Sequence, residues 1–224
     1  MAFHYGGRIV RDGLVLHINP ADKNSYIGSG TTIKDLSGNS NDATLLNGVG
    51  YSNGTFVFDG VNDMISRSAL PITLGETMMC WFNVDTIKTS GEDWLLSQYD
   101  LGLVGRTIFN IQGVGLGEPK LRYFIGGNAI YSTTTILTGV NYFGCVTRDI
   151  NGTTKIYING VEENSATLNT NSISITDFEI GNTIKLTTRQ SDGKIGDILV
   201  YNRALTQEEI LQNYNATKGR YGLS

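Results

Sequence analysis

Residues 193–210, GKIGDILVYNRALTQEEI, contain a strand, a corner and the start of a helix. The run from Ile195 to Tyr201 is apolar and rich in β-branched residues, which is typical of a buried strand. Thr206, followed three residues later by Glu209, forms a capping box, in which each residue satisfies the backbone N–H of the other. The stretch therefore predicts a last strand that leads directly into a capped helix.

The predicted helix has an apolar face. Leu205 and Ile210 occupy the hydrophobic-staple positions on either side of the cap, and Ile210, Leu211 and Tyr214 fall on one face. Gly219 is placed to end the helix. Because one short helix cannot form a core of its own, we expect it to pack on the β-structure or on a partner.

The rest of the chain has the period of short strands. The 224 residues include 28 Gly and only three Pro, which suits many strands joined by tight turns. We expect primed hairpin turns at Asn151-Gly152 and Asn159-Gly160, and another hairpin turn at Asp59-Gly60. Further predicted strands are Gly13–Ile18, Met78–Val84, Trp94–Ser97, Arg106–Ile111, Leu121–Ile125 and Phe178–Gly181. The fold class predicted is all-β, a two-sheet antiparallel jelly-roll sandwich with one short C-terminal helix, in a single domain over residues 1–224.

Composition excludes several classes of protein. With 40% hydrophobic and 17% charged residues the chain can bury enough apolar surface to fold. A net charge of −4 with no long basic run argues against nucleic acid as a partner. No segment approaches the ~20 apolar residues of a membrane span, so we expect no membrane insertion, and the first residues lack the apolar region of a signal peptide. Cys80 and Cys145 lie in apolar runs and are expected to be buried free thiols.

Four stretches resemble the laminin-G-like subgroup of the concanavalin A-like jelly rolls. They are DLSGNSNDAT at 35–44, FVFDGVND at 56–63, KIYINGVEE at 155–163 and the stretch at 193–210. They follow the order found in that family and span most of the chain. The resemblance implies two antiparallel sheets packed face to face. The family includes lectins, glycan-binding modules, adhesion domains and some glycosidases, so the fold alone does not give the function.

Two further stretches resemble versions of this domain in virion structural proteins of tailed bacteriophages. They are GLVLHINPADKNSY at 13–26 and NYNATKGRYGL at 213–223. The resemblance implies a non-catalytic virion structural protein, a capsid decoration or a tail-fibre or adhesin component, made in the host cytoplasm without a signal peptide. Its partners would be other virion proteins or copies of itself. The alternative is a carbohydrate-binding module for host glycans, and a glycoside hydrolase is a third hypothesis.

The resemblance also implies a structural calcium ion. It places candidate ligands at Asp35, Asn39 and Asn41, with Asp197 as a distant carboxylate. Calcium takes six to eight oxygen ligands from carboxylates, amides and backbone carbonyls, which such a loop supplies. The alternative is that these side chains cap their own turns, as Asx residues commonly do.

Catalysis would need two carboxylates flanking a sugar linkage. Asp177 and Glu179 alternate on one predicted strand and are the nearest such pair, but the surrounding glucanase pattern is missing, so we expect no enzyme. Asp59 and Asp63 admit two interpretations, as ligands at a sheet edge or as turn residues, and the Gly after Asp59 favours the turn.

A sugar site would use an aromatic ring and a few amides, because sugar faces stack on rings while hydroxyls need directional partners. The candidate contact residues are Tyr99, Tyr123 and Tyr131. Trp81 and Trp94 lie in apolar strands and are expected to fill the core.

Overall fold

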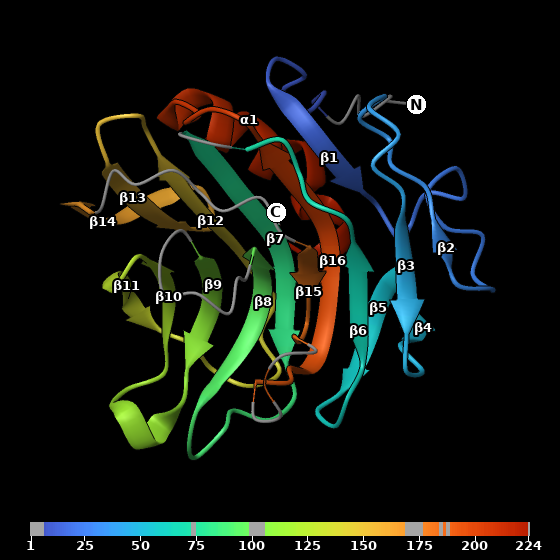
Figure 1. The fold of residues 1–224 in the computed structure, drawn as a ribbon, viewed down its shortest axis with the longest axis horizontal. Helices are drawn as coiled ribbons and strands as arrows, with labels where there is room; N and C mark the ends of the chain where they lie inside the picture. The colour runs from blue at the N-terminus through green and yellow to red at the C-terminus, as the bar shows by residue number, and fades with distance from the viewer. Residues whose placement is uncertain are drawn as a thin grey trace.

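Two eight-stranded antiparallel sheets make up most of the computed structural model. The structure describes residues 7–72, 75–98, 106–168, 177–183, 186 and 189–223. One sheet, called sheet A here, has the order β14-β13-β12-β7-β16-β5-β4, and β1 also pairs with β16. The other, sheet B, has the order β11-β10-β9-β8-β15-β6-β3-β2. Both sheets run in this order from one side of the molecule to the other (Figure 1).

The elements have the following bounds. Sheet A consists of β1 Leu14–Ile18, β4 Gly50–Ser52, β5 Thr55–Asp59, β7 Glu76–Val84, β12 Tyr142–Arg148, β13 Thr153–Ile158, β14 Val161–Thr167 and β16 Asp192–Tyr201. Sheet B consists of β2 Thr32–Ile33, β3 Ala43–Leu46, β6 Met64–Arg67, β8 Glu92–Gln98, β9 Thr107–Gln112, β10 Lys120–Ile125, β11 Asn128–Thr135 and β15 Phe178–Ile180. The helices are the 3₁₀ turn η1 Val114–Leu116, α1 Gln207–Thr217 and the 3₁₀ turn η2 Lys218–Tyr221.

The all-β sandwich predicted from the sequence is confirmed. Every longer strand expected from the sequence is present within a few residues of its predicted bounds. Four strands were not expected, and three of them, β2, β3 and β4, are only two to four residues long. The fourth, β11, carries a run of Thr and Ser that gives a weak hydrophobic signal.

One predicted hairpin is wrong. The chain does turn at Asp59 and Gly60, but β5 belongs to sheet A and β6 to sheet B, so this turn carries the chain from one sheet to the other. The Asp59 N–H donates to Asp63 Oδ2 at 3.1 Å, and Asp59 Oδ1 accepts from the Val61 N–H at 2.8 Å. Both carboxylates therefore act as turn residues, which is the interpretation that the sequence favoured.

The β12–β13–β14 meander forms as predicted, although its two turns differ. Asn159 and Gly160 both have positive φ, 53° and 81°, as a type I′ turn requires. At the other turn only Gly152 has a positive φ, and Asp149 Oδ1 accepts the N–H of Asn151 and of Thr153. The turn at Asn151-Gly152 is therefore stabilised by the Asp149 side chain and is not a primed turn.

The main core lies between the sheets, where the inward residues of both sheets pack together. A second cluster lies on the outer face of sheet A, beneath α1, and includes Trp81, Phe143 and Leu199. Cys80 and Cys145 are free and buried on adjacent strands, as predicted, but Cys80 faces the main core and Cys145 the outer cluster. Among the described residues no helix is long and apolar enough to cross a membrane.

Helix α1 begins as predicted and ends differently. The capping box of Thr206 and Glu209 is formed in both directions. The buried residues are Ile210, Asn213 and Thr217, whereas Leu211 is 43% exposed, so the buried face is rotated from the predicted one and includes a buried amide. Gly219 does not end the helix, because the chain continues through η2 to Gly222, whose φ is 76°.

Candidate functional site

A hollow of about 380 Å³ lies where the C-terminal η2 turn meets the edge of sheet A. We call it the C-terminal pocket. Five segments that are far apart in the sequence contribute to its wall. They are Ala21 after β1, Ser52–Thr55 at the β4–β5 turn, Asn141 before β12, Lys194 on β16 and Arg220–Gly222 at the end of η2.

The β4–β5 turn forms one wall of the C-terminal pocket. Asn53 and Gly54 have positive φ values of 49° and 76°, which is a primed hairpin turn. A Cβ added at Gly54 would lie 2.8 Å from the Cβ of Ala21, so the turn packs closely on the loop that follows β1. The Tyr51 hydroxyl donates to the Pro20 carbonyl at 3.1 Å and fixes the same contact. The hairpin is therefore held rigidly beside the pocket.

The opposite wall is η2, anchored by Tyr221. The Tyr221 ring stacks on Trp81 with 4.2 Å between ring centroids and 12° between planes. Its hydroxyl accepts the N–H of Asp197 at 2.7 Å. A Cβ at Gly196 would lie 2.1 Å from that hydroxyl, so only glycine at this position allows Tyr221 to reach the sheet.

An amide is fixed at the base of the C-terminal pocket. Asn141 Nδ2 donates to the Tyr221 carbonyl at 3.0 Å, and Asn141 Oδ1 accepts from Asn83 Nδ2 at 2.9 Å. These two bonds set the orientation of the amide plane. A preorganised amide of this kind binds a hydroxyl with little loss of side-chain entropy.

Two cations also line the pocket. Lys194 Nζ lies 3.3 Å from Asp85 Oδ1, and Arg220 Nη1 lies 2.9 Å from Asp197 Oδ2. The Asp197 side chain is fully buried. Burial raises the pKa of Asp197 to about 6, although the attraction of Arg220 acts in the opposite direction. Arg220 therefore compensates a buried carboxylate and presents the rest of its guanidinium at the pocket wall.

Hydroxyls, amides, two cations and one aromatic ring in a hollow of this size suit a small polar ligand such as a sugar unit. The lining contains no Asp or Glu among the residues that the structure describes. Within the described ranges, no group of three or more His, Cys, Asp or Glu is arranged to hold a metal ion. The side chains of the pocket can therefore bind a polar ligand through hydrogen bonds and through the two cations.

The candidate calcium ligands Asp35, Asn39 and Asn41 do come together, beside β1. The Asp35 carboxylate accepts four hydrogen bonds, from the N–H groups of His17, Ser37 and Asn41 and from the Ser37 hydroxyl.

The amides of the same loop are also engaged with protein groups. Asn39 Nδ2 donates to the Leu14 carbonyl at 2.9 Å, and Asn41 Nδ2 donates to the Val15 carbonyl. Asn41 Oδ1 accepts from the Arg67 guanidinium at 2.7 Å. Arranged in this way the loop does not fit a calcium ion, because both Asp35 oxygens and Asn41 Oδ1 already accept protein hydrogen bonds, the last from the cationic Arg67. Asp197 pairs with Arg220 on η2. Calcium binding stays a prediction for a titration to test.

The predicted sugar-contact tyrosines differ in their exposure to solvent. Tyr123 lies in the main core and is wholly buried, and its hydroxyl donates to the buried Glu76 carboxylate, so it has no surface for a sugar. This candidate is corrected, because the alternation of β10 turns Tyr123 inward. Tyr131 is 38% exposed on β11 and stays available. Tyr99 lies outside the described residues. Trp81 and Trp94 are buried, as expected.

Asp177 and Glu179, the nearest candidates for a catalytic pair under the glycosidase hypothesis, differ in burial. Glu179 is buried on β15, where it lies opposite Ser97 and Ser66, while Asp177 is exposed before the strand begins. Neither residue lines the C-terminal pocket.

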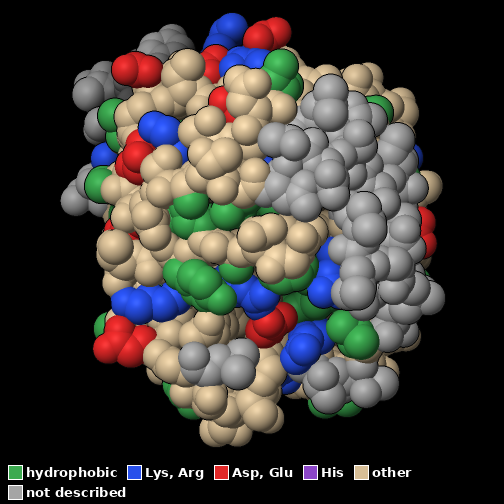
Figure 2. Space-filling view, turned by 60° about the vertical axis from the view of Figure 1, so that its left-hand side comes forward, with side chains coloured by type: hydrophobic (Ala, Val, Ile, Leu, Met, Phe, Trp, Pro, Cys, Tyr) green, Lys and Arg blue, Asp and Glu red, His purple; other side chains and the backbone are tan. Residues whose placement is uncertain are grey.

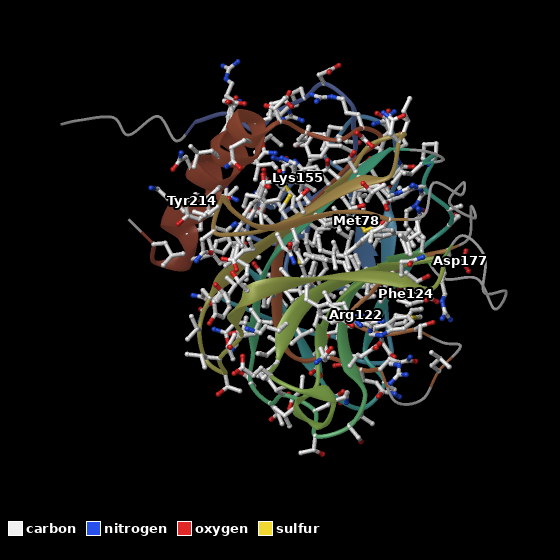
Figure 3. All side chains as sticks on the ribbon, turned by 90° about the vertical axis from the view of Figure 1, so that its left-hand side faces the viewer. Met78, Arg122, Phe124, Lys155, Asp177 and Tyr214 are labelled. Atoms are coloured by element: carbon white, nitrogen blue, oxygen red, sulfur yellow. The ribbon has the colours of Figure 1, made fainter. Side chains whose placement is uncertain are left out.

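The outer face of sheet B carries charged side chains beside a small apolar cluster of Trp94, Ile108 and Phe124. On it Glu92 accepts from Trp94 Nε1 at 2.9 Å and forms an ion pair with Arg122. The guanidinium groups of Arg106 and Arg122 lie 4.9 and 5.0 Å from the centre of the Phe124 ring. Arg122 and Phe124 lie on the opposite side of the core residue Met78 from Lys155 of sheet A (Figure 3). Charged and hydrophobic side chains are interspersed where β10, β11 and β14 come forward (Figure 2).

Comparison with known proteins agrees with this architecture. A family model of the laminin G type, from the concanavalin A-like lectin/glucanases superfamily, matches residues 59–211. The chain belongs to this superfamily. The match includes Asn141 and Lys194 of the C-terminal pocket but neither the β4–β5 turn nor η2. No curated protein sequence matches the chain.

Solved structures share the superfamily fold at low sequence identity. Domain 4 of AbnA, a GH43 extracellular arabinanase from Geobacillus stearothermophilus solved with arabinotriose, is 19% identical with a TM-score of 0.70, and the alignment covers 90% of this chain and 98% of that domain. Trypanosoma rangeli sialidase in complex with sialic acid is 16% identical with a TM-score of 0.69, over 96% of this chain and 35% of the sialidase. The binding domain of Paraclostridial Mosquitocidal Protein 1 is 18% identical with a TM-score of 0.71, over 95% of this chain and 56% of that chain. The chain thus spans about a third of the sialidase and just over half of the toxin domain.

Sequence reasoning missed the C-terminal pocket. One signal was present, since Asn53-Gly54 is a primed-turn dipeptide like Asn159-Gly160. The meeting of that turn with Lys194 and Arg220 depends on the strand order of sheet A, which no local pattern gives.

Proposed function

We propose that this chain is a non-catalytic carbohydrate-binding domain and that the C-terminal pocket holds the sugar. The observation that carries the proposal is the pocket itself, a hollow of about 380 Å³ with a fixed amide, hydroxyl groups and two cations beside Tyr221. Sugars need directional partners for their hydroxyls and an apolar surface for their ring faces. The pocket offers both within one rigid frame.

The arabinanase domain supports the proposal. It was solved with arabinotriose, and this chain matches almost its full length. At 19% identity the likeness concerns the fold, so the location of the sugar is argued from the pocket of this chain alone.

The distribution of carboxylates supports binding without hydrolysis. A glycosidase places two carboxyl groups roughly 5–10 Å apart across the sugar linkage. Among the described residues no carboxylate lines the C-terminal pocket, and the nearest candidate pair in the sequence consists of the exposed Asp177 and the buried Glu179.

A virion structural role is the second candidate. The two stretches that resemble virion proteins, 13–26 and 213–223, are neighbours in the structure, because Ala21 from one and Arg220–Gly222 from the other line the same pocket. Glycan binding is compatible with this role in a host-attachment protein. Mass spectrometry of purified native particles tests it, and a chain absent from such particles would remove this candidate.

A glycan array tests the proposed binding function. Wild-type protein is applied with calcium and again with EDTA, together with Ser52→Trp, which places an indole in the pocket, and Ser165→Trp, which adds the same ring on exposed β14. We expect wild type and Ser165→Trp to bind the same glycans and Ser52→Trp to lose them. Silence of wild type on every glycan in both buffers, or full binding by Ser52→Trp, would overturn the proposal. Circular dichroism of each variant confirms that it is folded.

A further inference from the structure

The charged side chains that line the C-terminal pocket are both cations, although the chain as a whole is acidic. The whole chain carries a net charge of −4. The described residues of the pocket lining nevertheless include Lys194 and Arg220 and no acidic residue. These two cations come from β16 and η2, which are separate elements brought together only by the fold.

The nearby carboxylates are already committed to other groups. Asp197 is buried and pairs with Arg220 from behind the pocket wall. Asp22, in the loop that contributes Ala21, accepts the backbone and side-chain N–H groups of Asn24. Asp85 is 46% exposed and is the partner of Lys194.

Lys194 can exchange its partner at little cost. Its contact with Asp85 is 3.3 Å long, and both side chains are more than 40% exposed. Ion pairs in such positions add little to stability, because water solvates both charges well and holding two long side chains together costs entropy. The Lys194 ammonium group can therefore leave Asp85 and pair with a ligand anion in the pocket.

Arg220 is positioned more firmly. Its Nη1 bond to Asp197 fixes one edge of a planar group that has five N–H donors. Tyr221, the next residue, is locked on Trp81 and bonded to the Asp197 backbone, which limits movement of η2. The remaining guanidinium donors are thus held at the wall, in the forked geometry that matches a carboxylate or sulfate.

From this charge pattern we infer that the preferred ligand of the pocket is an acidic glycan, one with a carboxylate or sulfate placed between Lys194 and Arg220. The inference rests on the proposed function, and it names the class of sugar. The fixed amide of Asn141 then serves the hydroxyls of the same residue, while the two cations give the preference for acidic over neutral sugars.

Isothermal titration calorimetry of the wild-type chain tests this inference. The probes are trigalacturonic acid, a sulfated galactan oligosaccharide, and arabinotriose and galactotriose as neutral trimers of similar size. At low salt we expect at least one acidic probe to bind about tenfold more tightly than the neutral trimers, since charge-assisted hydrogen bonds are the stronger class. The difference should shrink at 0.5 M NaCl through screening. The two acidic probes distinguish carboxylate from sulfate.

The variants are Lys194→Gln and the pair Arg220→Gln with Asp197→Asn, which avoids leaving a buried carboxylate without its cation. Lys155→Gln is the matched control, because Lys155 forms a similar exposed pair with Glu162, at 2.9 Å and with 40% and 36% exposure, away from the pocket. We expect the ratio of acidic to neutral affinity to fall toward one in the first two proteins and to stay as in wild type in the control.

Each outcome decides one of the two proposals. Neutral trimers that bind as tightly as the acidic probes, or an acidic preference that survives Lys194→Gln and the Arg220 pair, overturn the inference and leave glycan binding in place. Absence of binding to every probe, together with a silent glycan array, removes both.

Discussion

The outward residues of β7 in sheet A differ from those of β10 in sheet B, although sheet B also buries Trp94 and Ile108 outside the main core. Strand β7 of sheet A has the sequence ETMMCWFNV and is apolar on both sides, so Met79 and Trp81 project outward and are covered by α1 and η2. Strand β10 of sheet B alternates buried and half-buried residues, and its outward side chains include Arg122 and Phe124. A strand that is apolar on both faces needs a second layer, whereas an alternating strand can face solvent. The helix therefore packs on sheet A and not on sheet B.

The covering of sheet A also explains where the pocket lies. The cover consists of α1 and the short η2 turn, and the wall of the pocket is the end of that turn beside the β4–β5 hairpin. The stack of Tyr221 on Trp81, which covers part of the apolar face, thus also places Tyr221 in the lining of the C-terminal pocket.

The largest effect expected from this comparison is the loss of Trp81. Trp81 is 1% exposed, packs against Tyr221 and Phe143, and donates to the Thr217 hydroxyl at 2.8 Å. Trp81→Ala should lower the free energy of unfolding by about 3–5 kcal/mol, because it leaves a large cavity and removes the buried hydrogen bond from the indole N–H to the Thr217 hydroxyl. Phe124→Ala, a large aromatic truncation on the outer face of sheet B, should cost clearly less. Urea unfolding of both variants measures the difference. Equal losses of unfolding free energy would mean that covering by α1 and η2 does not make Trp81 more important for stability than Phe124.

The burial of Asp197 beside η2 should also affect how stability depends on pH. Burial raises the pKa of Asp197 to about 6, with Asp22 raising it further and Arg220 lowering it. An Asp carboxyl in the unfolded chain titrates near pH 4, so between these values the folded state binds the proton more tightly. The contribution to stability is therefore fully present below about pH 4 and is lost as the pH rises through 6.

The variant Asp197→Asn keeps a neutral side chain at every pH. Its free energy of unfolding should shift relative to wild type by on the order of 2–3 kcal/mol in favour of the variant between pH 4 and pH 7. Urea unfolding at pH 4, 5, 6 and 7 measures this shift. Parallel profiles for the two proteins would show that η2 does not bury this carboxyl in solution.

Local patterns were sufficient to predict most of the fold. The capping box at Thr206 and the Asn159-Gly160 turn depend on neighbours within a few residues, and both are formed. The local sequence at Asp59-Gly60 predicts a hairpin. Nothing in it shows that β6 joins sheet B while β5 belongs to sheet A. The sequence predicts a helix end at Gly219, whereas the chain continues through η2. The contact of Tyr221 with Trp81 that accompanies this continuation joins residues far apart in the sequence, so no local pattern indicates it.

The site was less predictable for a related reason. Tyr123 and Tyr131 both looked like ring platforms, and only the register of β10 and β11 separates the buried residue from the exposed one. The turn at Asn53 could have been found from its dipeptide. Its neighbours in the pocket, Lys194 and Arg220, are ordinary surface cations in the sequence, and their significance comes from being brought together by the sheet order.

A smaller effect is expected where η2 meets β16. Gly196→Ala adds a methyl group where the Tyr221 hydroxyl now lies, so η2 must move, and we expect a loss of about 1–3 kcal/mol together with weaker glycan binding. Gly219→Ala is the matched control, because no atom lies within 4 Å of an added Cβ there. Thermal melts and glycan titrations of both variants measure the two effects. A Gly196→Ala protein as stable and as active as the control would indicate that Tyr221 is not seated on the strand.

The smallest effect should come from the exposed outer side of β11, at Tyr131. Its ring is 38% exposed and lies 5.9 Å from the Arg122 guanidinium, a contact worth about 0.5–1 kcal/mol at an exposed site. Tyr131→Ala should therefore change stability by less than about 1 kcal/mol, and glycan binding should not change, because Tyr131 lies outside the C-terminal pocket. Tyr131→Phe, which keeps the ring, is the control for any loss of the aromatic contact. If Tyr131→Ala abolished glycan binding while Ser52→Trp retained it, the sugar would bind on the open outer face of sheet B, and the covered face would have only a structural role.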